Sequence, residues 1–147
     1  MNVGNLSPSQ LVLNVEINER GRKFGKKVDL RGGLKDALTR DAEKIAKDIG
    51  EKIFGKETNP SKVRQYYQVI VRLRDKLKSD SGNASVWNEF YMLKPKAQYD
   101  FNRKVINSVF QKFISEAVDK IDSKEDFERF ALFFEAVVGF FPKNTAQ

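Results

Sequence analysis

Basic side chains at helical spacing are the groups in this chain most able to do chemistry, and that chemistry would be the binding of phosphate. A first group, of three basic residues and one amide, lies on one flank of the predicted helix 60–78: Lys62, Gln65, Arg72 and Lys76. A second, basic group follows in the segment 94–104: Lys94, Lys96, Arg103 and Lys104. If the two helices are neighbours, both groups would line one groove. Contacts from Lys and Arg to phosphate need no base readout, so such a groove would bind nucleic acid largely regardless of sequence.

Catalytic chemistry has little support in the composition. The sequence contains no Cys and no His, which removes thiol nucleophiles, thiolate metal sites, and the commonest general base and metal ligand. Asp119, Asp122 and Asp126 are close in sequence, but they straddle a predicted helix junction and lack the spacing of a calcium loop. Lys or carboxylate chemistry remains formally possible, although no residue is singled out for it. We therefore expect a protein that is not an enzyme and uses no cofactor or metal.

The positive charge is concentrated in one part of the chain. The formal net charge is +7, and residues 60–104 hold ten basic against four acidic side chains. Such a surface is expected of a polyanion binder, although from composition alone a merely solvated surface explains it about equally well. The sequence has neither a run of about eighteen apolar residues nor the charged start of a signal peptide. We expect a cytoplasmic protein that does not contact a membrane.

Hydrophobic periodicity predicts an all-α fold, a compact bundle of about five helices. The expected helices cover residues 34–54, 60–78, 85–93, 95–121 and 123–141. Gly55 is expected to end the first helix, Pro95 to begin the fourth, and Ser123 to cap the last. The helical bundle domain would span residues 34–141, followed by a polar tail at 142–147.

Residues 1–33 are predicted to form a flexible or extended basic arm outside the bundle. Leu11, Leu13, Val15 and Ile17 alternate with other residues as in a strand, but they have no obvious pairing partner. Arg and Lys are then interleaved with Gly over residues 20–33, a composition with too little to bury. A flexible linker and a cationic arm that orders on nucleic acid explain this segment about equally well.

Some aromatic residues admit two interpretations. Trp87 in the short helix is expected to anchor the core, with a base-stacking platform as the less frequent alternative. Phe133 and Phe140 fall off the centre of the last helix's apolar stripe. This pattern is typical of a wide core face, or less often of a contact with another protein.

Three segments resemble the motifs of one known family. Residues 94–103 resemble a Lys-Pro-Lys-x-x-Tyr-x-x-x-Arg pattern, residues 61–67 are similar to a Ser-Lys-Ile-Arg-x-x-Tyr opening, and residues 130–138 contain a Phe-Phe-Glu-Ala-Val-Val signature. In this order and at this chain length, they resemble the small subunit of type III-A CRISPR effector complexes (the Csm complex). The resemblance covers about residues 34–141.

The resemblance implies a helical bundle that does not itself cleave RNA. Copies of the chain would stack along the complex beside the backbone subunit and together with the large subunit. They would line the channel in which guide (CRISPR) RNA pairs with target RNA, holding the sugar-phosphate chain with basic residues. By matching position, the resemblance supports Lys62, Arg64, Lys96 and Arg103 as RNA-binding residues. Tyr99 would help to hold the bundle together, and Asp100 would damp the attraction of its cationic neighbours for phosphate.

A protein from another class fits the same sequence. In a homo-oligomeric scaffold or adaptor without direct nucleic-acid binding, the additional Phe surface would carry the function. The basic residues would then only solvate the surface.

Overall fold

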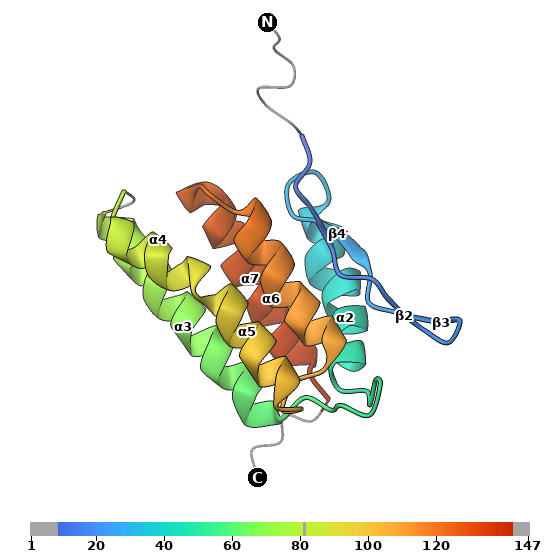
Figure 1. The fold of residues 1–147 in the computed structure, drawn as a ribbon. Helices are drawn as coiled ribbons and strands as arrows, with labels where there is room; N and C mark the ends of the chain where they lie inside the picture. Colours follow the sequence, from blue (N-terminus) through green and yellow to red (C-terminus); the bar gives the residue numbers. More distant parts are fainter. Residues whose placement is uncertain (1–8, 81, 143–147) are drawn as a thin grey trace, which may run out of the picture.

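A series of helices preceded by two antiparallel strand pairs makes up the computed structural model of the protein, which describes residues 9–80 and 82–142 (Figure 1). The elements are β1 (Val12–Asn14), β2 (Ile17–Glu19), β3 (Arg22–Phe24), β4 (Lys27–Asp29), α1 (Leu34–Asp36), the π-helix η2 (Ala37–Asp41), α2 (Ala42–Ile49), α3 (Pro60–Ser79), α4 (Ala84–Tyr91), α5 (Leu93–Asn102), α6 (Ser108–Lys120) and α7 (Lys124–Phe140). The predicted helical bundle is confirmed, but the all-α prediction did not include the paired strands, of which only the strand-like alternation at residues 11–17 was recognised. Of the predicted tail, all but Pro142 lies outside the described residues.

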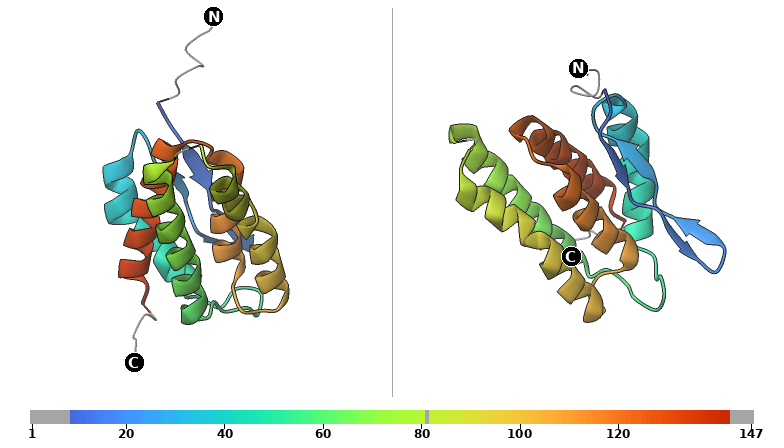
Figure 2. Two further views of the ribbon diagram at one scale, coloured as in Figure 1. Left: turned by 90° about the vertical axis from the view of Figure 1, so that its left-hand side faces the viewer. Right: turned by 45° about the horizontal axis from the view of Figure 1, so that its top comes forward.

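The helices lie in layers, with α6 and α7 between the others. α3, α4 and α5 cover one side of this pair, and α2 with the strands covers the other (Figure 2). The rings of Phe113 and Phe134 lie 5.1 Å apart and belong to a fully buried aromatic core. Phe133 is also fully buried, as a wide core face requires, whereas Phe140 is 41% exposed. Trp87 is half-buried and meets the ring of Phe127 edge-on at 5.8 Å, so it anchors the core as predicted.

The single long helix predicted over residues 95–121 is wrong, because the chain turns between α5 and α6. Lys104 has a φ of +67°, a conformation that cannot continue a helix. Asn107 is fully buried, and its Oδ1 accepts a hydrogen bond from the Phe110 N–H that caps α6. Its Nδ2 donates to carbonyls where α2 ends, those of residues 48, 49 and 51. This amide therefore ties the start of one helix to the end of another, a long-range contact that periodicity does not record.

The first predicted helix is also shorter than residues 34–54. α1, η2 and α2 together run from Leu34 to Ile49, and Gly50 follows as the C-cap. Ile53 is buried as predicted, but it lies in the loop 50–59, where its backbone exchanges two hydrogen bonds of 2.9 Å with Lys56. Gly55, with a φ of +76°, makes this tight turn and does not end the helix.

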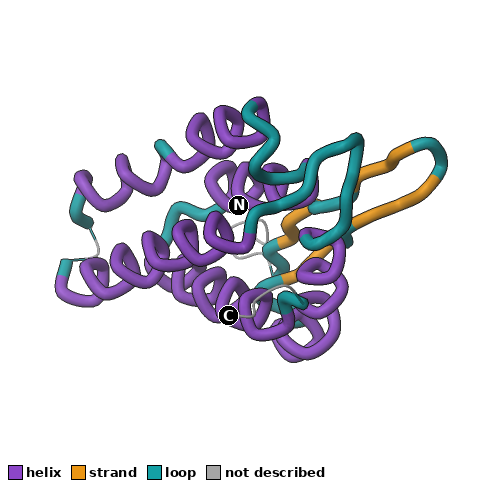
Figure 3. Tube along the Cα trace, turned by 90° about the horizontal axis from the view of Figure 1, so that it is seen from below, coloured by secondary structure: helices purple, strands orange, loops and turns teal. Residues whose placement is uncertain are grey.

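Residues 11–30 form a β-hairpin, so the segment predicted as a flexible or extended basic arm is extended, and it is paired with itself. β1 pairs with β4 and β2 pairs with β3, so the alternating apolar residues find their partner in the Gly-, Arg- and Lys-rich segment itself. Leu13 is opposite Val28, and both are fully buried. The outer part of the ribbon extends past the helices (Figure 3). The sequence concealed this pairing because the buried residues of β3 and β4 are isolated among cations.

Contacts with three helices fix the hairpin to the body. The Gly25 N–H donates to Asp48 Oδ2 of α2 at 2.7 Å. A Cβ at this glycine would lie 1.7 Å from the carbonyl oxygen of Val15, so no other residue fits here. The Asn14 N–H donates to Glu116 Oε1 of α6 at 2.7 Å.

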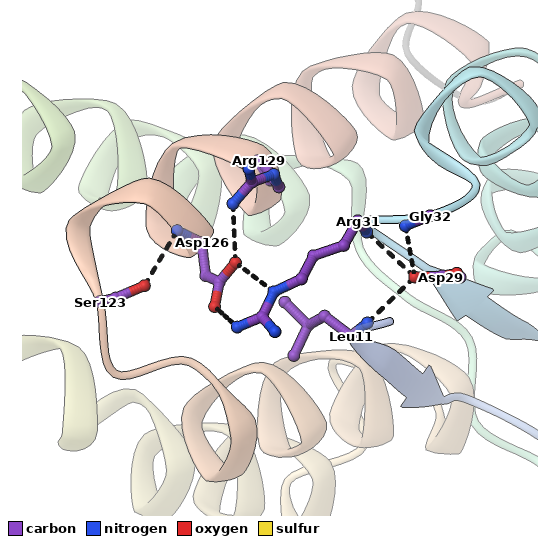
Figure 4. A network of polar contacts seen from close by, with 7 residues as sticks. All are labelled: Leu11, Asp29, Arg31, Gly32, Ser123, Asp126 and Arg129. Carbon is purple, nitrogen blue, oxygen red and sulfur yellow. Dashed lines mark hydrogen bonds and ion pairs between the residues drawn. The ribbon is translucent and has the colours of Figure 1, made fainter. Parts of the chain in front are cut away.

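The third anchor is an ion pair between Arg31, which follows the hairpin, and the first turn of α7. The Asp126 side chain is buried and accepts two hydrogen bonds from Arg31, from Nε to Oδ1 at 3.0 Å and from Nη2 to Oδ2 at 2.5 Å (Figure 4). Arg129 Nη1 adds a contact of 2.9 Å to Asp126 Oδ1. Mainly because of the Arg31 hydrogen bonds, the pKa of the Asp126 carboxyl lies below its ordinary value. Ser123 caps the same helix as predicted, accepting from the Asp126 N–H.

Candidate nucleic-acid interface

The candidate interface is built around one buried carboxylate, that of Asp100 in α5. Its side chain is fully buried, and the Tyr66 hydroxyl of α3 donates to Oδ2 at 2.7 Å. Burial, together with this hydrogen bond, raises the pKa of Tyr66, so the phenol stays protonated and remains a donor. Asp100 therefore joins α5 to α3 and fixes the spacing between the two helices that were predicted to share a groove.

Three of the predicted basic residues meet at this carboxylate. Lys62 Nζ lies 3.6 Å from Oδ1, Lys96 Nζ lies 3.6 Å from Oδ2, and Arg103 Nη1 lies 3.8 Å from Oδ1. We call these three residues with Asp100 the Asp100 cluster. One negative charge faces three positive charges, so the cluster keeps a local excess of positive charge. Asp100 lies four residues after Lys96 and three before Arg103. This helical spacing could be seen in the sequence.

The cations of the Asp100 cluster remain available to a ligand. Charge-assisted hydrogen bonds are usually about 2.7–2.9 Å long, shorter than the three separations here. Among the described residues, Oδ1 of Asp100 accepts no hydrogen bond. The side chains of Lys96 and Arg103 are 43% and 51% exposed, and that of Lys62 is 18% exposed. Asp100 thus attracts these cations without forming short hydrogen bonds to their N–H groups. Phosphate oxygens can reach the same N–H groups from solvent.

An exposed aromatic ring accompanies these cations. Tyr99 is 60% exposed, and the Arg103 guanidinium carbon lies 5.3 Å from its ring centroid. The expectation that Tyr99 holds the bundle together is therefore wrong. An exposed ring beside a guanidinium can stack on a base or ribose, which every nucleotide offers.

The other predicted residues lie outside the Asp100 cluster. Arg72 pairs with Glu89 of α4, and Lys94 Nζ contacts Asp119 Oδ1 of α6 at 2.6 Å. Arg72 lies ten residues beyond Lys62 along α3, about 15 Å away at the helical rise. The Arg72 hydrogen bond, with a smaller contribution from the charge of Lys76, lowers the pKa of Glu89. Of the predicted RNA-binding residues, the structure therefore brings only Lys62, Lys96 and Arg103 together at Asp100, while Arg72 and Lys94 pair with carboxylates elsewhere.

The remaining predicted residues are close to the cluster in sequence. Arg64 and Gln65 are exposed on α3, close in sequence to Lys62. Lys104, in the turn after α5, lines a hollow of about 520 Å³ together with Lys52, Gly55 and residues 57–60.

Sequence reasoning missed the basic residues of the loop 50–59. Lys56 Nζ lies 3.4 Å from the ring centroid of Phe101, the residue after Asp100. Lys52 lines the same hollow as Lys104. These positions depend on the end of α2 at Ile49 and on the turn between Ile53 and Lys56. Helical periodicity gave no signal for either.

Features that would indicate other chemistry do not accompany the cluster. No group of His, Cys, Asp and Glu residues in the described part of the chain could hold a metal ion. A search of the same residues finds no helix with the length and apolar character needed to cross a membrane.

The chain is thus a small helical protein in which three cations gather around one buried carboxylate. A family model described as Csm2 Type III-A matches residues 36–144. The chain therefore belongs to this family and is a small subunit of a type III-A Csm complex, as the resemblance of its three segments predicted. Comparisons with curated proteins and with solved structures find no match to this chain.

Proposed function

We propose that the protein is a non-catalytic, RNA-binding small subunit of a cytoplasmic type III-A CRISPR interference complex. It lines the channel in which guide RNA pairs with target RNA, beside further copies of itself and the backbone and large subunits. Another subunit cleaves the RNA. The Asp100 cluster holds the sugar-phosphate backbone without reading base identity.

The convergence of Lys62, Lys96 and Arg103 on one buried carboxylate is the observation that carries this proposal. Helices α3 and α5 are separate in sequence, yet Asp100 brings their cations to a single place. A buried anion that pre-positions three cations lowers the entropy lost when they order around phosphate. Exposed Tyr99 adds a stacking surface that accepts any base.

A salt titration tests the electrostatic part of the proposal. If roughly five phosphates are neutralised, the logarithm of the affinity for single-stranded RNA should fall with the logarithm of salt concentration at a slope near −3.5. Filter binding with two unrelated RNA sequences measures the slope, and both sequences should give the same affinity.

A flat salt dependence would contradict the proposal. Light scattering on the same samples separates it from the scaffold alternative. Oligomers that retain no RNA would favour the scaffold.

A further inference from the structure

The β-hairpin lies outside the part of the chain that the family model matches, and the proposed function does not use it. The match begins at residue 36, whereas the hairpin covers residues 11–30. The hairpin is nonetheless fixed to the body of the protein. Leu13, Phe24 and Val28 are buried in the hydrophobic core, and Lys112 Nζ of α6 donates to the Glu16 carbonyl at 2.8 Å. A fixed extension of this kind presents its side chains in defined positions.

Those side chains are strongly cationic. Residues 17–27 contain five basic side chains and one carboxylate, that of Glu19. Arg22 is paired with Glu51 and Lys26 with Asp41, at 3.9 Å and 2.8 Å. The other three are exposed, and in the described part of the chain no carboxylate lies within ion-pair distance of them: Arg20, Lys23 and Lys27.

The strand register places amides beside two of these lysines. Lys23 is directly opposite Asn18, and Lys27 is directly opposite Asn14. Residues opposite each other in an antiparallel pair project from the same face. Each lysine thus shares its face with an amide, which can donate to a phosphate oxygen and does not repel it.

The loop 50–59 connects the hairpin tip to the Asp100 cluster. Glu19 Oε2 accepts from the Phe54 N–H at 2.9 Å, and Arg22 pairs with Glu51, so the only carboxylate in residues 17–27 is used to hold the loop. The same loop reaches α5 through Lys56 over Phe101 and carries Lys52 to the hollow beside Lys104. Figure 3, which views the molecule from this side, shows the loop and the strands at the same end. Basic side chains therefore continue from the cluster across the loop to the hairpin.

We propose that the hairpin is a second contact for the sugar-phosphate backbone of the RNA held at the Asp100 cluster. This inference rests on the proposed function and extends it to residues outside the family match. Lys23, Lys27 and Arg20 bind phosphates beyond those bound by Lys62, Lys96 and Arg103. From Val15 to the tip at Gly21 the ribbon spans about 20 Å, enough for about six phosphates at ~3.4 Å each.

RNA length discriminates this second contact from the first. An RNA of about 6 nucleotides can fill the cluster alone, whereas one of about 25 nucleotides can also reach the hairpin. In the full chain, Lys23→Glu with Lys27→Glu should weaken binding of the longer single-stranded RNA at least tenfold. Binding of the shorter RNA should change by about twofold or less, because the cluster is intact. Fluorescence anisotropy at fixed salt measures both affinities.

Two further variants separate failure of this inference from failure of the proposed function. Arg40→Glu with Lys47→Glu makes the same charge change at exposed positions of η2 and α2. If this control loses as much RNA affinity as the hairpin variant, net charge explains the loss and the inference is overturned. If Lys96→Glu with Arg103→Glu weakens binding and the hairpin variant does not, the inference fails and the proposed function stands. If only the hairpin variant weakens binding, the proposed site at the cluster fails, and with it the inference that the hairpin is a second contact beside that site.

The neutral pair Arg20→Gln with Lys23→Gln replaces the hairpin variant if thermal unfolding shows that charge reversal disturbs the fold. It should give a smaller loss with the same dependence on RNA length. Competition by polyglutamate as effectively as by RNA of equal charge would overturn the inference in favour of an acidic protein partner.

Discussion

Replacing both Lys96 and Arg103 by Glu is expected to weaken RNA binding about 100-fold or more, equally for unrelated sequences. Each substitution removes a charge-assisted contact worth about 1.5 kcal/mol or more, and 1.4 kcal/mol is a factor of ten in affinity. The new carboxylates would also repel phosphate from a cluster already centred on Asp100. Filter binding of two unrelated single-stranded RNAs to wild type and variant measures the effect.

A charge-matched control shows whether position or net charge causes the loss. Arg40 and Lys47 are exposed on the layer that carries α2, away from α5, so reversing both changes the total charge equally. This control should weaken binding only a few-fold, through the long-range field. A cluster variant that loses affinity for one sequence alone would contradict backbone recognition. Circular dichroism should confirm that the variant is folded, since Lys62 and Tyr66 still contact Asp100.

The second large effect concerns stability: Asp126→Asn is expected to destabilise the protein by about 2–3 kcal/mol near neutral pH. The substitution removes a buried charge that accepts hydrogen bonds from Arg31 and Arg129, and hydrogen bonds to charged groups are worth about 1.5–3 kcal/mol. The loss should fall on the anchorage of the hairpin to α7. Urea unfolding of both proteins at about pH 7 gives the difference in the free energy of unfolding.

The same difference should shrink in acid. Because Arg31 lowers the pKa of Asp126 in the folded state, the carboxylate stabilises the fold above its ordinary pKa of 3.8. That stabilisation is lost as the pH falls through the lower, folded-state pKa. Repeating the urea titration at progressively lower pH, below about pH 4, should bring the two proteins together.

Glu125→Gln provides the control for this comparison. It removes one negative charge from the same first turn of α7 at an exposed position. A loss of about 0.5 kcal/mol or less is expected from the helix dipole alone. If Glu125→Gln and Asp126→Asn destabilise equally, the ion pair with Arg31 is not what stabilises the fold.

Local patterns in the sequence predicted most of the helices. The apolar stripes of α3 and α7 are continuous, and Asn59, Pro60 and Ser123 mark where these helices begin. The convergence of Lys62 with Lys96 and Arg103 was also predictable, because the helical faces and two of the family-like segments, 61–67 and 94–103, pointed to the same residues. Such features depend on neighbours within one or two turns, which a sequence displays directly.

Features that depend on distant partners could not be predicted. Asn107 interrupts the expected long helix because its Nδ2 donates hydrogen bonds to the carbonyls of residues 48, 49 and 51, which are more than fifty residues away in sequence. The hairpin forms because Val28 and Phe24 pack against the helices, although the surrounding Gly, Arg and Lys residues are typical of a linker. Arg31, in that same basic segment, pairs with Asp126 across 95 residues. In each case tertiary contacts override the local preference.

The dependence of RNA affinity on salt in a neutralised variant tests the central claim most directly. In the chain with Lys62→Gln, Lys96→Gln and Arg103→Gln, each lost phosphate contact should reduce the steepness of the log–log plot by about 0.7 for single-stranded RNA. We therefore predict a slope shallower than that of the wild-type chain by about 2, by the same amount for every RNA sequence. A variant whose slope equals that of the wild-type chain would show that these cations do not neutralise RNA phosphates.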